Sequence, residues 1–352
     1  MGKIIKIDPQ QPDEKLIKEA AQIIKNGGLV IIPTETVYGI AVDSSNRKAV
    51  ERLSCVKQRP EDKSYSLHIA AKDKVTQYAK DISIGTWKLV SKFWPGALTI
   101  VFKAKDGSTV GMRMPDDEIA LKVISYCSCP VICPSANISG EPPAVSAQEI
   151  SASLVEKVDL VLDAGRVRLG KESTVIDVTQ NKFKLLRQGF ITKEEIEKEF
   201  SMKTVLFICT GNSCRSVMAE AFLVDRLKKK NRTDVEVLSA GIMLLEGSGA
   251  SSLTKEVMSQ NGIDVSAHRS KRITPELLRK SDIILVMEKM HEERVLAMAP
   301  DVKSRVFLLK EFAKIEDEGD LNIEDPMGSS GDLYLATSET IKQAVERIVD
   351  II

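Results

Sequence analysis

Residues 205–222 read VLFICTGNSCRSVMAEAF and place a cysteine, Cys209, at the start of a polar loop that an arginine, Arg215, closes. Backbone amides at a helix start favour an anion, and Gly211 lets the loop turn inward so that successive amides converge. Arg215 would add a planar pair of donors to a tetrahedral anion. A thiol in such a cradle is stabilised as a thiolate, which is a nucleophile at neutral pH. The alternative is a buried cysteine at a strand end beside an unrelated arginine.

A second set of polar residues lies in the first 200 positions. CVKQRP sets Lys57 and Arg59 on alternate positions, so on an extended segment both cations would point the same way and could hold a polyphosphate. The alternative is a solvated basic face. PTETVYG (33–39) and CPSANISG (133–140) are polar, glycine-containing loops with many hydroxyl and amide groups. GKESTVIDV and LLRQG add two further polar positions, Ser173 and Arg187.

Hydrophobic periodicity and glycine or proline breaks predict the elements that position these residues. In the first half we expect a helix over 14–28, strands over 29–33 and 98–104, and a charged helix over 191–200 capped by Thr192. After residue 200, strands at 203–209, 235–241, 282–287 and 304–309 alternate with helices at 216–230, 252–262, 274–281 and 338–352. Such alternation predicts an α/β fold with a mainly parallel sheet. We expect domains at 1–200 and 201–352.

Length and composition favour a globular protein of two domains. The chain has 352 residues, of which 43% are apolar and 28% charged, and its formal net charge is zero. Bulk charge therefore does not indicate nucleic-acid binding. The first residues lack the pattern of a signal peptide, no apolar run approaches the length of a membrane span, and the six cysteines are too scattered for a secreted disulfide framework. We expect a cytoplasmic protein without membrane contact.

Three thiols gather in CSCPVIC at 127–133. Their spacing is not that of a zinc site, and no histidine lies near them in the sequence. We expect no metal site in this chain.

The string CTGNSCRS resembles the phosphate loop of the low-molecular-weight protein-tyrosine phosphatase family. LSAG at 238–241, DVSAHRS at 264–270 and EDP at 324–326 agree with that resemblance, which covers about residues 203–352. It implies a four-stranded parallel, Rossmann-like domain that acts through a phosphocysteine. Cys209 would attack the phosphorus, Arg215 would hold the oxygens, and Asp325 would protonate the leaving group and then activate water. The loop implied by the resemblance consists of Thr210, Gly211, Asn212, Ser213, Cys214 and Ser216, with Ser216 donating to the thiolate.

The resemblance leaves the phosphatase substrate open between phosphotyrosine and phosphoarginine. Few aromatic residues lie near the expected site, and Ser213 resembles the small hydroxyl residue of the protein-arginine phosphatase branch, which favours phosphoarginine. Cys214 could pair reversibly with Cys209 or simply pack. Val217 departs from the usual proline of the family. An arsenate reductase or a phosphate sensor without turnover is the alternative for this half.

The first half resembles the YrdC-type threonylcarbamoyl-AMP synthase family over about residues 1–199. Six landmarks stand in order: Thr34, Lys57 with Arg59, Arg113, Ser135–Asn137, Ser173 and Arg187. The resemblance implies a twisted mixed α/β sheet and synthesis of threonylcarbamoyl-adenylate from threonine, bicarbonate and ATP, with ATP as a substrate and Mg²⁺ beside it. Lys57, Arg59, Ser135, Asn137 and Arg187 would bind ATP. Thr34, His68, Arg113 and Ser173 would line the threonine pocket.

Together the two resemblances imply a fused bifunctional enzyme. Its product would feed threonylcarbamoyladenosine formation by the tRNA modification machinery, and its phosphatase would act on a phosphoprotein. The alternative for the first half is a module that binds RNA, including double-stranded RNA, without turnover.

Overall fold

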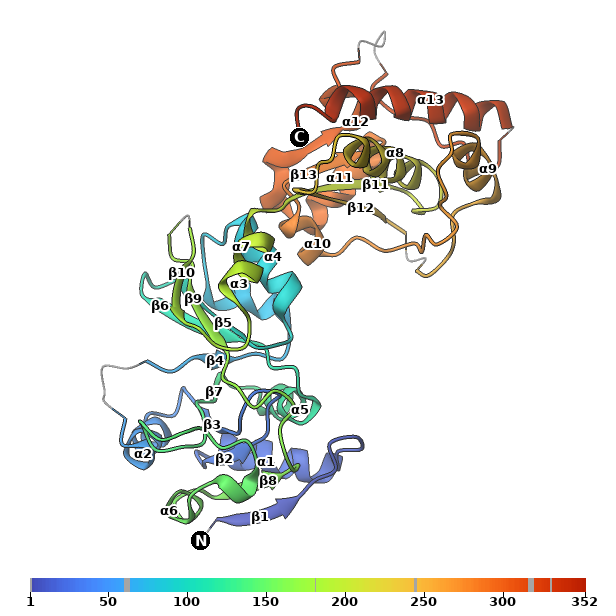
Figure 1. Ribbon diagram of the computed structural model, residues 1–352. Coiled ribbons are helices and arrows are strands. Elements are labelled where there is room, and N and C mark those ends of the chain that lie inside the picture. Colours follow the sequence, from blue (N-terminus) through green and yellow to red (C-terminus); the bar gives the residue numbers. More distant parts are fainter. Residues whose placement is uncertain (1, 60–63, 181, 244–245, 316–319, 330) are drawn as a thin grey trace. The chain divides into compact units, whose positions relative to one another are not determined.

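The computed structural model describes the chain except residues 1, 60–63, 181, 244–245, 316–319 and 330. The chain forms two compact units, Met1–Glu197 and Lys198–Ile352 (Figure 1). The unit boundary lies within a charged helix, α7 (Lys193–Ser201), which begins after Thr192 as the sequence predicts. Thr192 and Glu195 cap the helix reciprocally, since the side chain of each accepts a hydrogen bond from the backbone amide of the other.

The described residues of the first unit build one mixed sheet of ten strands, in the spatial order β1-β8-β2-β3-β7-β4-β6-β5-β9-β10. Parallel pairs (β1 with β8, β2 with β8, β4 with β6, β5 with β9) mix with antiparallel ones, which confirms the mixed sheet expected for this half. The strands are β1 (Lys3–Lys6), β2 (Val30–Ile32), β3 (Gly39–Asp43), β4 (Leu67–His68), β5 (Leu98–Lys103), β6 (Thr109–Arg113), β7 (Val131–Ile132), β8 (Leu160–Asp163), β9 (Thr174–Asp177) and β10 (Lys184–Arg187).

Helices cover this sheet through apolar faces with helical spacing. In α1, residues Ile17, Ala20, Ala21 and Ile24 are buried, and the side chain of Asp13 caps the first turn. This helix ends at Lys25, inside the predicted range 14–28, because Gly27 takes a left-handed φ of 83°. The helices of this unit are α1 (Glu14–Lys25), α2 (Arg47–Lys57), α3 (Val75–Tyr78), α4 (Ile84–Phe93), α5 (Glu118–Cys127) and α6 (Ala152–Val155).

One expectation for the first half is wrong. Lys57 is the last residue of α2, and Gln58 caps that helix in a left-handed conformation with φ 51°. The segment that carries Lys57 and Arg59 is therefore a helix end rather than an extended stretch, so alternate positions do not place the two cations on one side.

The described residues of the second unit form the predicted four-stranded parallel sheet, and its strand order is β12-β11-β13-β14. Successive side chains of the central strand alternate between two cores. Val205, Phe207 and Cys209 face one hydrophobic cluster, and Leu206 and Ile208 face the other. The strands are β11 (Lys203–Cys209), β12 (Val235–Gly241), β13 (Ile283–Val286) and β14 (Val306–Leu308).

Helices lie on both faces of this second sheet. The core that contains Cys209 is completed by α8, α9 and α13, whereas α10 and α11 contribute to the opposite core (Figure 1). The helices are α8 (Arg215–Lys229), α9 (Ser252–Gln260), α10 (Pro275–Lys280), α11 (Lys289–Met298), α12 (Leu309–Phe312) and α13 (Gly331–Ile348). The last helix begins seven residues before the predicted one, at Gly331.

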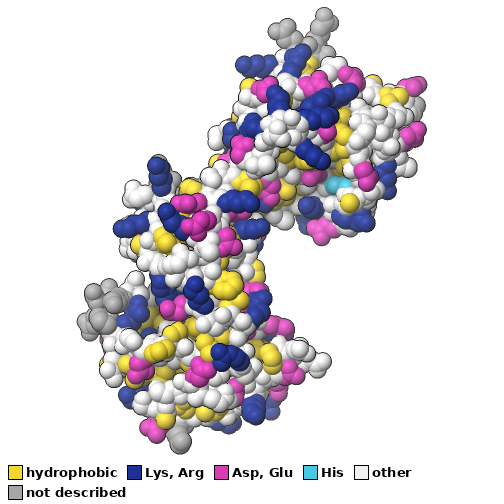
Figure 2. All heavy atoms as spheres, in the orientation of Figure 1, with side chains coloured by type: hydrophobic (Ala, Val, Ile, Leu, Met, Phe, Trp, Pro, Cys, Tyr) yellow, Lys and Arg dark blue, Asp and Glu magenta, His cyan; other side chains and the backbone are white. Residues whose placement is uncertain are grey.

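The surface is mixed in charge. Figure 2 shows basic and acidic side chains interspersed over the visible face of both units. Within the part of the chain that the structure describes, no helix is long and apolar enough to span a bilayer.

Candidate active sites

The thiol of Cys209 lies at the carboxyl end of the central strand β11, where the chain turns into α8. Its side chain is buried, at 2% exposure. The Sγ atom accepts a hydrogen bond from the backbone amide of Asn212 at 3.3 Å, and the hydroxyl oxygen of Ser216 lies 3.0 Å away. The sulfur therefore lies among polar groups at the start of a helix.

Asn212 fixes the shape of this loop. It takes a left-handed conformation, with φ 53°, and is fully buried. Its side-chain amide donates to the hydroxyls of Ser216 (3.0 Å) and Ser239 (2.8 Å). Its side-chain oxygen accepts from the amide of Lys271 at 2.8 Å, and its carbonyl lies 2.8 Å from His268 Nε2. One residue thus ties the loop to two other segments of the unit, β12 and residues 268–271.

Arg215 is the first residue of α8 and is almost completely buried, at 1% exposure. Its Nη1 donates to Glu288 Oε2 at 2.7 Å and to the Ile323 carbonyl at 2.7 Å. Its Nη2 donates to Asp325 Oδ2 at 2.5 Å and to Thr210 Oγ1 at 3.1 Å. Asp325, which spacing alone could not place, therefore meets the phosphate loop. Glu288 was missed, because its partner Arg215 is distant in sequence and no local pattern indicates that contact.

A second missed residue, His291, contacts the loop from α11. Its Nε2 lies 2.9 Å from Thr210 Oγ1, and its Nδ1 accepts from the amide of Glu288 at 3.0 Å. Burial, and next the charge of Arg215, lower the pKa of His291 to about 4. The neutral ring therefore carries its proton on Nε2 and donates it to Thr210. A histidine three residues after a glutamate at a helix start was the available signal, as in a capping box.

The remaining loop residues stand beside α9 and α13. Cys214 is buried, and its Sγ lies 3.3 Å from Tyr334 Oη and 3.4 Å from Ser251 Oγ. Ser213 is partly exposed, and its carbonyl accepts from the Ser251 amide at 3.0 Å. The cysteines of this loop are both free thiols in the structure. Cys214 packs against hydroxyl groups here.

The first unit holds a cavity of about 300 Å³. All four residues predicted for the threonine pocket line it, and so do three of the five predicted for ATP. The sheet brings them together, because β4 and β6 are paired in register so that His68 lies opposite Arg113. The predicted residues that line the cavity are Thr34, His68, Arg113, Ser173, Arg59, Ser135 and Arg187.

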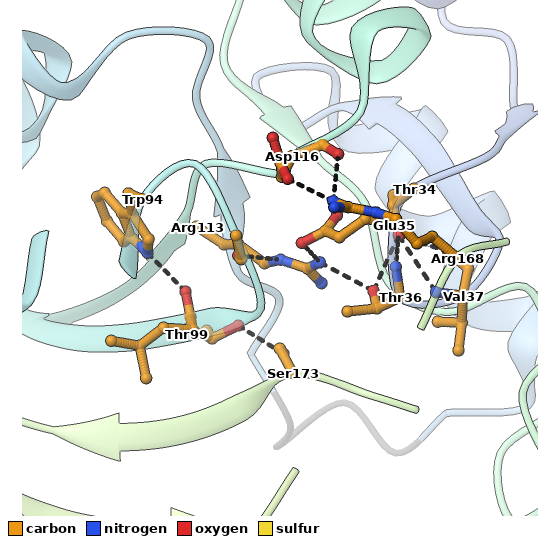
Figure 3. A network of polar contacts seen from close by, with 12 residues as sticks. Thr34, Glu35, Thr36, Val37, Trp94, Thr99, Arg113, Asp116, Arg168 and Ser173 are labelled. Atoms are coloured by element: carbon orange, nitrogen blue, oxygen red, sulfur yellow. Dashed lines mark hydrogen bonds and ion pairs between the residues drawn. The ribbon is translucent and has the colours of Figure 1, made fainter. Parts of the chain in front are cut away.

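Arg113 is held in place by a buried carboxylate (Figure 3). Its Nη2 donates to Glu35 Oε1 at 2.6 Å and to Thr36 Oγ1 at 2.8 Å, and its Nε donates to the Gly96 carbonyl at 3.2 Å. Arg113 is 5% exposed and Glu35 3%. The second carboxylate oxygen of Glu35 is buried without a hydrogen-bond partner among the described residues. The sequence singled out Arg113 but not the carboxylate that orients it.

His68 is neutral in this cavity. Burial, and next the charge of Arg113, lower the pKa of its imidazole to about 3. A neutral ring can both donate and accept a hydrogen bond, so it is suited to a polar uncharged group of a ligand.

Two other arginines present cations to the same cavity. The Arg187 guanidinium pairs with Glu172 at 2.7 Å and donates to the Ser173 carbonyl at 2.9 Å. The Arg59 guanidinium lies 4.7 Å from the ring centroid of Tyr65. Glu172 and Tyr65 also line the cavity and were not predicted.

Lys57 and Asn137, two of the residues predicted to bind ATP, are not among the residues that line the cavity. Lys57 Nζ donates to the carbonyls of Ser135 at 2.5 Å and Asn137 at 2.8 Å, and its side chain is buried. Burial, followed by the charge of Arg59, lowers the pKa of Lys57 to about 8. Asn137 bonds back to the carbonyls of Ile138 and Glu141. Both residues therefore stabilise the 133–140 loop through hydrogen bonds to its carbonyl groups and to the Glu141 carbonyl.

The thiols at 127–133 are protonated and buried or partly buried. Burial raises the pKa of Cys127 and Cys133 to about 12 and that of Cys129 to about 11. Among the residues that the structure describes, no group of three or more His, Cys, Asp or Glu side chains could hold a metal ion.

Comparison with known proteins identifies both units. The Sua5/YciO/YrdC family model, described as telomere recombination, matches residues 22–189, and the model of low molecular weight phosphotyrosine protein phosphatase matches 204–352. The threonylcarbamoyl-AMP synthase of Pyrococcus abyssi is 40% identical over 195 residues, 53% of this chain and 57% of its own length. The chain thus spans little more than half of that curated relative.

Two further matches support the first unit. A relative from Methanocaldococcus jannaschii is 33% identical over 206 residues, which are 56% of this chain and 98% of its own length. The crystal structure of Pyrococcus abyssi Sua5 complexed with L-threonine aligns with a TM-score of 0.54 and 27% identity, covering 87% of this chain and 99% of that one. The chain therefore belongs to the Sua5/YrdC family through its first unit and carries a low-molecular-weight phosphotyrosine phosphatase domain as its second.

Proposed function

We propose that the first unit makes threonylcarbamoyl-adenylate from L-threonine, bicarbonate and ATP. The observation that carries this proposal is the convergence of seven predicted residues, far apart in the sequence, on one cavity. The names of the curated relatives support it. In the reaction a carbamate oxygen forms a bond to the α-phosphorus of ATP, and the bond from that phosphorus to pyrophosphate breaks.

The charges of the cavity suit this chemistry. Arg59 and Arg187 would spread the charge of the departing pyrophosphate, which is how positioned cations stabilise phosphoryl-type transfers. Arg113, held by Glu35, would take the threonine carboxylate, and neutral His68 would bond a polar group beside it. Mg²⁺ would be bound chiefly through the ATP phosphates, since this ion is usually held by one or two protein carboxylates together with substrate oxygens.

Pyrophosphate release from ATP tests the synthase. We expect the full-length protein to release pyrophosphate only when threonine and bicarbonate are both present. Release that ignores threonine contradicts the proposal. RNA binding without any turnover would favour the RNA-binding module instead. We further propose that the adenylate is consumed by a tRNA-modifying transferase and that the protein is cytoplasmic.

For the second unit the proposal is hydrolysis of a phosphorylated protein through Cys209. The carrying observation is that Arg215 joins the thiol's loop to the carboxylate of Asp325. The sulfur attacks phosphorus, an S–P bond forms, and the bond to the leaving group breaks while Asp325 supplies a proton. Water then attacks, Asp325 takes its proton, and the S–P bond breaks to release phosphate.

The phosphorylated residue is proposed to be arginine. Ser213 is a small, partly exposed residue of the loop that holds the thiol, and the ring of the nearby Tyr334 is buried. Neither residue therefore offers an aromatic ring that could stack against a phenol. Initial rates on matched phosphoarginine and phosphotyrosine peptides test this point, and a clear preference for phosphotyrosine contradicts it. Turnover of neither, with reduction of arsenate or phosphate binding alone, would favour the reductase or the sensor.

A further inference from the structure

Three methionines of the second unit are unusually exposed. Met243, Met290 and Met327 are 48%, 51% and 55% exposed. Every other methionine among the described residues is buried or half-buried. Single exposed apolar side chains are ordinary, but a cluster at one place marks an interaction surface.

The backbones of all three lie beside the phosphate loop or beside residues that contact it, on three different segments. The backbone amide of Met243 donates to the Thr210 carbonyl at 3.0 Å. Met327 follows Asp325 by two residues, and its amide donates to that carboxylate at 3.2 Å. Met290 lies in the first turn of α11 between Glu288, which pairs with Arg215, and His291, which contacts Thr210. We call Met243, Met290 and Met327 the rim methionines.

The position of the rim methionines decides what can cover them. Cys209 and Arg215 are buried in the loop, so a phosphate group must pass the segments that surround the loop, and these segments carry the rim methionines. The residues on either side of the phosphorylated residue then lie over the rim. The geometry points to a phosphorylated protein segment whose flanking side chains are apolar. This inference rests on the proposed phosphatase function and names the substrate class of that site.

The chemistry of methionine says how selective this contact is. Its side chain is unbranched, has three rotatable bonds and carries a polarizable sulfur, so it adapts to partners of different shape. Such a rim favours leucine, isoleucine or methionine flanks over polar ones without requiring one sequence. Covering the exposed half of each rim side chain corresponds to about a three- to tenfold gain in kcat/KM.

The test compares two phosphopeptides on the full-length protein. They carry the same phosphorylated residue, flanked by leucine in one and by serine in the other, and p-nitrophenyl phosphate serves as the small substrate without flanks. We expect kcat/KM to be at least tenfold higher for the leucine-flanked peptide. The triple variant M243S/M290S/M327S should lose most of that ratio, and should lose more activity on the leucine-flanked peptide than on p-nitrophenyl phosphate.

Val224→Ser is the matched control. Val224 is 47% exposed, but it lies in α8 nine residues beyond Arg215, roughly 13 Å along the helix. This variant should keep the peptide preference. If the triple variant also keeps it, or if the wild-type protein prefers serine flanks, the inference is wrong. It is equally wrong if the triple variant changes only self-association in sedimentation, since the rim would then be a contact between copies.

Failure of the proposed phosphatase function gives a different result from failure of the inference about the rim methionines. A wild-type protein that hydrolyses neither peptide nor p-nitrophenyl phosphate is not a phosphatase. The rim is then tested by fluorescence anisotropy of the labelled leucine-flanked peptide. Binding that the triple variant loses supports a phosphopeptide-binding surface, and absence of binding overturns the inference.

Discussion

The two sites of this chain are built in opposite ways. In the second unit the anion cradle comes from one short stretch, 209–216, between a strand and a helix. In the first unit the cavity is lined by segments spread from Thr34 to Arg187 across the sheet. The residues of a contiguous site can be predicted from the sequence because their geometry is set by one strand, one loop and one helix start. A distributed site depends on strand order, which no local pattern supplies.

Both sites nevertheless contain a buried positive charge that a carboxylate neutralises. Each keeps a nearly buried arginine, Arg113 or Arg215, and each pairs it with a carboxylate from a distant segment. An unpaired buried charge would be strongly unfavourable. The difference is that Glu35 is buried, whereas Asp325 is 37% exposed and can exchange its partner.

The sharpest contrast is expected from Cys209→Ser. A hydroxyl replaces the nucleophile, so phosphatase turnover should fall on the order of 10⁴-fold or more, while threonine-dependent pyrophosphate release should be unchanged. Cys55→Ser, an exposed cysteine of the first unit, is the control and should alter neither rate. Loss of the synthase activity in Cys209→Ser would show that the two sites are not independent.

Glu35→Gln tests whether the buried pair of the distributed site orients Arg113. Without the carboxylate, Arg113 loses its counter-charge and its fixed direction, so KM for threonine should rise on the order of 10- to 100-fold while KM for ATP changes less. The control is Glu51→Gln, which removes an exposed pair with Arg47 and should cost under about 0.5 kcal/mol of stability. Equal rises in both KM values would contradict an orienting role.

Lowering the pH should reduce the free energy of unfolding of both units, because each contains a buried neutral histidine. The pKa values of His68 and His291 are lowered to about 3 and about 4. Below pH 6.5 the unfolded chain binds a proton that the folded chain does not, so the free energy of unfolding should fall by up to about 1.4 kcal/mol per pH unit per histidine until the folded pKa is reached.

Urea unfolding at pH 7, 6, 5 and 4 measures this dependence. His68→Gln should flatten it for the first unit only, and His291→Gln for the second only. If the curve of either variant runs parallel to the wild type, that histidine is not buried in its neutral form.

Lys57→Met gives the smallest expected effect. Two carbonyls of the 133–140 loop lose their donor, which should lower the free energy of unfolding by about 1–2 kcal/mol and raise KM for ATP several-fold. Arg59→Met should raise KM for ATP without loss of stability, since Arg59 lines the cavity. Lys48→Met, at an exposed position of α2, is the control. A stable Lys57→Met protein would argue that Lys57 does not support the loop.

Local patterns predicted much of the fold. The parallel sheet of the second unit follows from alternating periods, and the position of Cys209 at the end of β11 follows from a buried run that meets a polar loop. Helix α2 was not predicted, and its end is hard to recognise in the sequence because Gln58 adopts a left-handed conformation that glycine or asparagine usually signals. Glu35 and Glu288 were missed because their contacts with Arg113 and Arg215 arise only in the tertiary structure. The spacing of Glu288 and His291 indicates a helix start but does not reveal that His291 contacts Thr210.

The contacts of Arg215 have a consequence for how an anion could enter its loop. The two terminal nitrogens are occupied by the carboxylates of Glu288 and Asp325, whereas the buried Nε has no hydrogen-bond partner among the described residues. An anion in the loop can therefore be bound by Nε alone, and it gains a second donor of Arg215 only in competition with one of the two carboxylates. Asp325 is the more exposed of the two, so it is the carboxylate that such competition would release first.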